Sequence, residues 1–415
     1  MKGDDHMTEQ MAGGSIALER LEKGLPPGRG AFLKKMTAGL DPLTAFLSDQ
    51  YLDHYICLGG SKMKFVTGRS GSGKTHFSMR MLDEAADRGF ITVSFSAKDV
   101  WLHDFREIYL EILRQCDIEH ILQGCADQIV RELGYDPAQI GPGKSFMDHL
   151  SEKGEADPIS RGEIRSALRT YFTKNPLLDN NFACCCSILT GGILGHPVLE
   201  PASRDLVLSY LYGDKSVKLG QLRTLGLSPS RVTKVNARHL LRSLAEVVHL
   251  AGYKGLIVSV DDLEMVMNRA AGSAMRYTKL RRNDAFESIR QLIDDIDNMR
   301  YIMFLFGFER GLMDNENTGF KTYQALWMRI QNEVVSTRFN RFADIIDLDR
   351  YAEESYTEDV LIEMSGKIAR VLTDLGRSVK MLDREKAGEL LERSKFGGIG
   401  LPYLVAREVL SEDSI

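Results

Sequence analysis

The sequence lacks several features that mark common protein classes. No apolar run approaches the roughly 18 residues that a membrane-spanning helix needs, so no membrane association is expected. Residues 1–15 are polar and acidic, and they lack the apolar stretch of a secretory signal peptide. These absences favour a protein of the cytoplasm.

Cysteines are few and poorly spaced for metal binding. Of the six, three are adjacent at 184–186, and no pair has the C-x2-C spacing of a zinc site. We therefore expect reduced thiols, some of them buried. The nine histidines form no metal-spaced cluster either. A formal net charge of −5 excludes attraction of the whole molecule to nucleic acid, but it allows a local basic patch.

The chain has 415 residues, of which 43% are hydrophobic and 27% are charged, and this describes a globular protein of two or three structural units. β-Branched apolar runs separated by helical patterns predict an α/β fold. The predicted strands are Met63–Thr67, Phe90–Ala97, Gly255–Asp262, Arg300–Phe308 and Ala343–Leu348. The predicted units are an N-terminal helical segment (1–50), a core in two parts (51–117 and 249–350), a helical insertion (118–248) and a C-terminal helical segment (351–415).

A phosphate-binding loop follows the first predicted strand. Residues 68–75 read GRSGSGKT and fit the pattern G-x-x-x-x-G-K-[ST], with a helix predicted over 74–88. Glycines let backbone N–H groups converge on phosphates, and the start of the helix adds further donors. Lys74 is expected at the β- and γ-phosphates, and the Thr75 hydroxyl at Mg²⁺. The predicted nucleotide-binding residues are Gly68, Arg69, Ser70, Gly71, Ser72, Gly73, Lys74, Thr75 and His76.

The strand Gly255–Asp262 ends in two carboxylates. A carboxylate at the end of a buried strand can hold the Mg²⁺ shell, and Asp261 is the candidate. For the residue that activates water we favour Asp262, with Glu264 as the alternative, because reach and geometry decide such a role. The competing interpretation is that both aspartates only cap the next helix.

Segments spread over most of the chain together resemble the ATP-binding P-loop proteins of the BREX phage-defence type, a branch related to AAA+ ATPases. These segments are IALERLEKGLPP, FVTGRSGSGKTHF, EAADRGFITVSFS, LAEVVHLAGYKGLIVSVDDLE, RRNDAFESIRQLIDDI and YQALWMRI. Related ATPases accompany other DNA-modification clusters, including phosphorothioation systems, and that alternative stays open.

The resemblance implies an AAA+/ASCE-like P-loop NTPase with a parallel sheet flanked by helices. The strand Tyr301–Phe306 would lie between the phosphate-loop strand and the Asp261 strand, and the C-terminal segment would form a helical lid. The resemblance also implies ATP rather than GTP, and the sequence contains no Asn-Lys-x-Asp guanine-reading motif. The implied partners are other proteins of a defence or DNA-modification cluster, and further copies of the chain.

Three departures from the family pattern are expected to slow hydrolysis. Asp262 replaces the usual glutamate, and Gly307 begins a triplet where a Thr, Asn or Ser normally orients water. In the lid, Tyr403 follows Pro402 where an arginine is common, and Arg407 lies a little over one turn later.

Arginines outside these motifs are candidates for two further roles. Arg329 is the first candidate for stabilising charge on the γ-phosphate, from a neighbouring subunit or a lid. Weaker candidates are Arg338, Arg341 and Arg407. The stretch 268–284 could contact the DNA backbone. It contains Arg269, Arg276, Tyr277, Lys279, Arg281 and Arg282. For each, an ordinary solvated surface charge is the alternative.

Two functions therefore compete. The first is an ATP hydrolase that drives a defence or DNA-modification complex. The second is a nucleotide-loaded scaffold or switch that recruits partners with little turnover. A small-molecule P-loop kinase is disfavoured by the long insertion, which carries no recognisable chemistry and is expected to dock partners.

Overall fold

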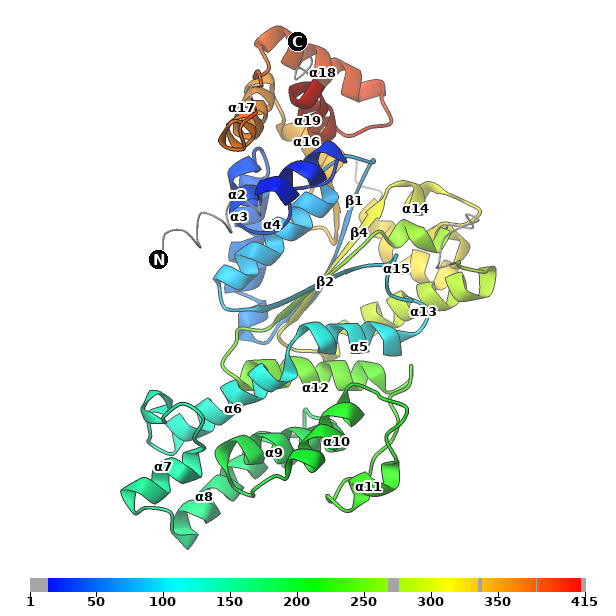
Figure 1. The fold of residues 1–415 in the computed structure, drawn as a ribbon. Coiled ribbons are helices and arrows are strands. Elements are labelled where there is room, and N and C mark those ends of the chain that lie inside the picture. The colour runs from blue at the N-terminus through cyan, green and yellow to red at the C-terminus, as the bar shows by residue number, and fades with distance from the viewer. Residues whose placement is uncertain (1–13, 268–275, 335–337, 378, 412–415) are drawn as a thin grey trace.

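The computed structural model describes residues 14–267, 276–334, 338–377 and 379–411. At its centre lies a five-stranded parallel sheet in the order β2-β3-β4-β1-β5 (Figure 1). The strands are β1 (Ser61–Gly68), β2 (Ile91–Ser96), β3 (Leu256–Asp261), β4 (Ile302–Glu309) and β5 (Ile345–Asp347). As the resemblance implies, β4 lies between the phosphate-loop strand and the Asp261 strand.

Side chains of the central strands alternate between two apolar cores, one on each face of the sheet. On β4, Ile302, Phe304 and Phe306 join one core, whereas Met303 and Leu305 join the other. A parallel strand buried on both faces is apolar at nearly every position. This is why β3 and β4 are readable in the sequence as continuous apolar runs.

Helices from both ends of the chain cover the core that contains Met303 and Leu305. The helix at 14–22 belongs to this layer, and Figure 1 shows the C-terminal helices beside it, above the phosphate-loop end of the sheet. The other helices of this layer are α2 (Ala31–Met36), α3 (Asp41–Leu47), α4 (Lys74–Asp87), α16 (Leu348–Ser355), α17 (Glu358–Asp374), α18 (Arg384–Phe396) and α19 (Leu401–Ser411).

The opposite core extends from the sheet into the insertion without a break. Its helices next to the sheet are α5 (Phe105–Gln115), α12 (Ala237–Leu250), α13 (Lys279–Asp295), α14 (Gly311–Asp314) and α15 (Gln324–Val334). The insertion adds α6 (Ile118–Glu132), α7 (Phe146–Lys153), α8 (Pro158–Leu168), α9 (Asn180–Leu194), α10 (Pro201–Leu211) and α11 (Leu219–Arg223). α12 packs on both α5 and α6, so sheet and insertion share one apolar cluster.

The predicted strands and the helical nature of 118–248 are confirmed, with shifts at element boundaries. α13 begins at Lys279, and a capping residue sets this start. Thr278 is that residue, because its hydroxyl accepts a hydrogen bond from the Arg281 N–H and caps the helix. The six cysteines are free and four are buried, as expected. Among the described helices, none has both the length and the apolar character to cross a membrane.

One buried lysine attaches the short edge strand β5 to the sheet. Lys64 lies on β1 with its side chain fully buried. Its ammonium donates to the carbonyls of Phe342 and Ala343 at 2.9 and 2.7 Å, next to the Asp344 carboxylate at 3.2 Å. These carbonyls lie just before β5, which shares only three residue pairs with β1. The buried lysine therefore supplies a charged donor to carbonyls just before the short strand.

Replacing Lys64 with methionine should lower the free energy of unfolding by about 3 kcal/mol, because two carbonyls and the Asp344 carboxylate lose the charged donor that they share. Urea denaturation would measure it. Lys62→Met is the matched control, since Lys62 also pairs with Asp344 but its side chain remains 29% exposed. Its loss should stay below about 1 kcal/mol. Equal losses in the two variants would contradict this role for Lys64.

Candidate functional site

The predicted phosphate loop connects β1 directly to α4. Two of its glycines have left-handed backbone conformations, with φ of 76° at Gly71 and 91° at Gly73, which is the residue before α4. A Cβ at Gly71 would lie 2.5 Å from the Cβ of Tyr403, so the position requires glycine for space as well as for conformation. The start of α4 thus presents its N–H groups at the end of the sheet.

Lys74 and Thr75 extend from the first turn of α4. The Lys74 ammonium donates to the loop carbonyls of Gly68 and Arg69 at 3.3 and 2.9 Å. The Thr75 hydroxyl donates to the Asp261 carboxylate across 2.5 Å. The loop on α4 and the end of β3 therefore meet, although Thr75 and Asp261 are 186 residues apart in the chain.

The neighbouring strand β4 leaves room for the Asp261 carboxylate. A Cβ at Gly307 would clash with the Asp261 Oδ1 atom. The glycine at this position is thus the residue that lets Asp261 occupy its place. Burial raises the pKa of the Asp261 carboxyl, and the hydrogen bond from Thr75 opposes that shift.

The two candidates for activating water are held differently. Asp262 has a left-handed backbone, with φ of 59°, and its carboxylate accepts from the Ser96 hydroxyl at 2.6 Å and the Lys98 ammonium at 2.7 Å. Both partners belong to the end of β2 and the turn after it. Glu264 instead accepts from the Glu309 N–H at 3.0 Å, and burial raises the pKa of its carboxyl.

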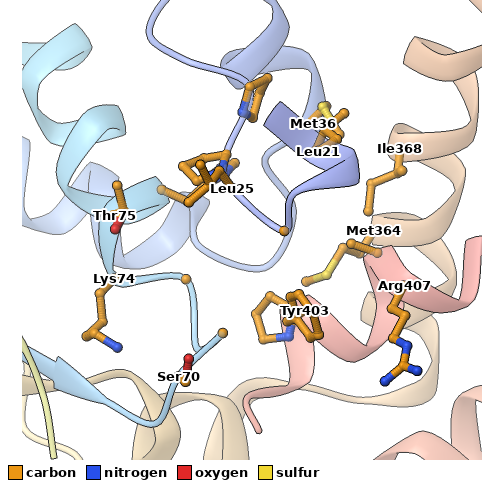
Figure 2. A pocket seen from close by; sticks show the side chains of 18 of the residues that line it. Leu21, Leu25, Met36, Ser70, Lys74, Thr75, Met364, Ile368, Tyr403 and Arg407 are labelled. Carbon is orange, nitrogen blue, oxygen red and sulfur yellow. The ribbon is translucent and has the colours of Figure 1, made fainter. Parts of the chain in front are cut away.

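A cavity of about 550 Å³ opens beside these groups. Figure 2 shows its walls: Ser70, Lys74 and Thr75 on the loop side, with apolar side chains from both ends of the chain opposite. The N-terminal segment contributes Leu21, Gly24, Leu25, Pro26, Pro27, Met36, Ala38 and Leu40. The C-terminal segment contributes Tyr356, Met364, Ile368, Arg377, Pro402, Tyr403, Ala406, Arg407, Leu410 and Ser411. The loop end of the cavity is therefore polar, whereas the walls from the two ends of the chain are mainly apolar and also include the charged residues Glu22, Arg377 and Arg407.

Of the predicted site residues, nine line this cavity: Ser70, Gly71, Gly73, Lys74, Thr75, His76, Asp261, Asp262 and Glu264. His76 lies within 2.8 Å of the Thr37 hydroxyl, and burial lowers the pKa of its imidazole to about 4. Arg69 turns away from the cavity. Its guanidinium donates to the carbonyls of Ser394 and Gly397, and its backbone N–H to the Asp349 carboxylate.

The C-terminal segment bonds to the phosphate loop through the backbone. The N–H of Gly400 donates to the Ser70 carbonyl at 2.8 Å, and that of Tyr403 to the Gly71 carbonyl at 3.2 Å. Any Cβ at Gly400 would clash with the backbone of Ser72. Two loop carbonyls are thus fixed by the turn before α19 and by its first residues.

The candidate arginines are dispersed. Arg329 pairs through two nitrogens with Asp294 at 2.5 and 2.8 Å, and it does not line the cavity of its own chain. Arg341 lies over the Phe46 ring, and Arg338 lines a separate small cavity. Arg407, ranked lower from the sequence, is the one that lines the main cavity (Figure 2).

The basic stretch 268–284 is only partly a surface. Residues 268–275, with Arg269, lie outside the described residues. Tyr277 is buried and its hydroxyl accepts the Leu102 N–H, so it is unavailable for the contact expected of it. Arg282 is buried as well, whereas Arg276 and Lys279 are exposed.

The donors at the loop suit Mg²⁺. A hydroxyl and a carboxylate, held together at 2.5 Å beside the phosphate loop, are the hard oxygen ligands that this ion prefers. Within the described residues, no group of three or more His, Cys, Asp or Glu side chains could hold a metal ion. Bound Mg²⁺ would therefore take its other ligands from phosphates and water.

Sequence reasoning missed the apolar walls of the cavity. The sequence pattern assigned no nucleotide contact to the segment GLPPG, yet Leu25, Pro26 and Pro27 line the cavity. Tyr403 was noted only because it stands where an arginine is common. Both GLPPG and the segment around Gly400 and Pro402 contain glycine next to or near proline. Such residues are found where two backbones approach closely, and this pattern could have indicated the contact.

A comparison with known protein families matches residues 14–156 and 178–412 to the family described as BREX system ATP-binding protein BrxC/D. A comparison with curated proteins found no match. The matched ranges include the phosphate loop, the end of β3 and both apolar walls of the cavity. The chain therefore belongs to the BrxC/BrxD family of BREX system ATP-binding proteins.

Proposed function

We propose that this chain binds ATP with Mg²⁺ in the cavity beside the phosphate loop and hydrolyses it slowly in support of BREX antiviral defence. The observation that carries the proposal is the direct contact between the Thr75 hydroxyl and the Asp261 carboxylate next to that loop. Family membership supports the ATP-binding role. Thr75 and Asp261 would hold Mg²⁺, which neutralises charge on the phosphates when bound.

The two ends of the cavity suit the two ends of ATP. Lys74 and the N–H groups at the start of α4 bind the triphosphate. The end between Leu25 and Tyr403 takes the base, and the volume of the whole cavity, about 550 Å³, lies in the range of ordinary ligand pockets. Lys74 now donates to carbonyls of its own loop, bonds that a phosphate oxygen would replace.

For the residue that orients water we favour Glu264 over Asp262. Both oxygens of Asp262 already accept hydrogen bonds from Ser96 and Lys98, which hold this carboxylate toward β2. Glu264 lines the cavity as Asp262 does, and burial raises the pKa of its carboxyl, which makes it the stronger proton acceptor. Its role would be to orient and deprotonate the attacking water.

The alternative is a nucleotide-dependent switch or scaffold with little turnover. It is favoured by the hydrogen bonds that hold Asp262 and by Gly307, which offers no side chain to orient water. Segments from both chain ends line the cavity, so nucleotide binding would join them in either case.

Several finer points of this proposal rest on the family resemblance. These are an AAA+ type of core, a lid formed by α17–α19, location in the cytoplasm, and assembly with other BREX proteins or further copies of the chain. In such an assembly Arg329 would act on a neighbouring subunit, and Arg407 within its own. Contact with DNA through 268–284 would rely on the exposed Arg276 and Lys279.

Lys74→Ala and Asp261→Ala should reduce phosphate release from ATP to the level without enzyme, with and without DNA. The reason is that the first removes the charge at the phosphates and the second the carboxylate at Mg²⁺. Lys62→Ala, a change on β1 outside the cavity, should release phosphate at the wild-type rate. A wild-type rate equal to that of Lys74→Ala under every condition would exclude the hydrolase and leave the switch.

Exchanging the two acidic candidates for their amides would identify the residue that orients water. We expect Glu264→Gln to lower the single-turnover rate by about 10²-fold or more, the usual contribution of a general base. Asp262→Asn should change it by only a few-fold, and both variants should retain ATP affinity. The reverse order of effects would assign the role to Asp262.

Gly400→Ala should weaken ATP binding by about tenfold, because its Cβ would force the C-terminal segment off the backbone of Ser72. Titration with a fluorescent ATP analogue measures this. Gly398→Ala is the matched control, since a Cβ there meets nothing within 4 Å. Equal affinities for Gly400→Ala and wild type would show that the loop needs no support from this segment.

A further inference from the structure

Residues 215–245 contain seven lysines and arginines and no acidic residue. At the average frequency in this chain, with 58 Asp and Glu in 415 residues, about four acidic residues would fall in a stretch of that length. The other acid-free stretch of similar length, 54–82, contains the phosphate loop. The absence of acidic residues is thus unusual in a chain whose net charge is negative.

We call residues 215–236, between α10 and α12, the basic arm. Figure 1 shows it around α11, at the end of the molecule opposite to α17–α19. Its five basic residues are all exposed: Lys215, Lys218, Arg223, Arg231 and Lys234. Between them, Val217, Leu222 and Leu227 are buried in the core of the insertion. The arm therefore has an apolar inner side and a cationic outer side.

Hydrogen bonds hold this arm in a fixed conformation. The Tyr210 hydroxyl on α10 donates to the Ser230 carbonyl at 2.8 Å. The Asn236 amide donates to the Arg231 carbonyl at 3.0 Å. Arg231 in turn donates to the Val217 carbonyl at 3.3 Å, which brings it next to Lys218. A fixed arrangement of cations can match a rigid partner at low cost in conformational entropy.

The charges of the arm are not neutralised within the chain. Among the described residues, none of the five forms an ion pair, unlike Arg204 with Glu119 or Arg238 with Asp295. Asp214 is the acidic residue near Arg231, and its carboxylate already accepts the Ser216 N–H at 2.8 Å. The outer side of the arm therefore presents a net positive charge to the solvent.

Lys234 of the arm and Arg281 at the start of α13 both lie near His103. Burial lowers the pKa of the His103 imidazole, and the positive charges of Arg281 and Lys234 lower it further. Arg281 lies over the Trp101 ring at 4.8 Å. The carboxylates of Asp104 and Asp284 also face His103, so the positive charge is greatest on the arm itself.

We propose that the basic arm binds the phosphate backbone of duplex DNA. Exposed, unpaired cations on a rigid support gain affinity by releasing the counterions that surround a duplex. Single strands are a poorer match, because proteins bind them by stacking bases on aromatic rings, and residues 213–252 contain no Phe, Tyr or Trp. This site is separate from the ATP cavity and does not depend on the function proposed for it.

The test measures binding of a fluorescein-labelled 25-base-pair duplex DNA to the full chain by anisotropy, over a range of NaCl concentrations. The variant is Lys218→Gln with Arg223→Gln. The matched control is Arg161→Gln with Arg165→Gln, an equal loss of exposed charge on α8. We expect the arm variant to bind the duplex about tenfold more weakly than wild type. The slope of log K against log[NaCl] should become shallower by about two, because each lost phosphate contact contributes about 0.9 to that slope. The control should change less than twofold.

Unchanged ATP affinity in both variants would show that they remain folded, and the DNA result then decides. Absence of duplex binding by wild type at low salt would overturn the proposal. Equal losses in the two variants, or tighter binding of single-stranded DNA or duplex RNA of the same length, would do so as well. Binding that persists when Lys74→Ala abolishes phosphate release would support the arm independently of the ATPase proposal.

Discussion

The architecture around the cavity depends on one contact, the hydrogen bond from Thr75 to Asp261. It requires β1 and β3 to end at the same edge of the sheet, with β4 between them. It also requires β4 to be without a side chain at Gly307, because Asp261 occupies that space. The long insertion must therefore return the chain to the sheet accurately enough to bring two oxygen atoms within 2.5 Å.

Local signals predicted the elements that carry this contact. A phosphate loop is recognisable because each residue type in it has a backbone or charge requirement, from Gly71 to Thr75. The strands β3 and β4 are recognisable because a parallel strand buried on both faces is a nearly continuous apolar run. Asp261 follows from its place at the end of such a strand. These features are contiguous in sequence, so composition and order suffice to find them.

Features built from distant segments could not be predicted. The contact of Gly400 with the phosphate loop uses backbone atoms, which carry no residue-type signature apart from the glycine itself. Lys64 would be expected at a surface, since nothing local reveals the carbonyls that surround it. Tyr277 was placed among exposed charges, yet its hydroxyl meets the Leu102 N–H in the interior. In each case the deciding partner lies more than a hundred residues away.

The shared apolar cluster of sheet and insertion has a mechanical consequence. α12 ends at Leu250 and β3 begins at Leu256, while α12 also packs on α5 and α6. Close-packed interiors transmit displacement rather than absorb it. Any force that tilts the insertion as a rigid lever must therefore shift the strand that ends at Asp261, and with it the spacing of the two oxygen atoms at the mouth of the loop.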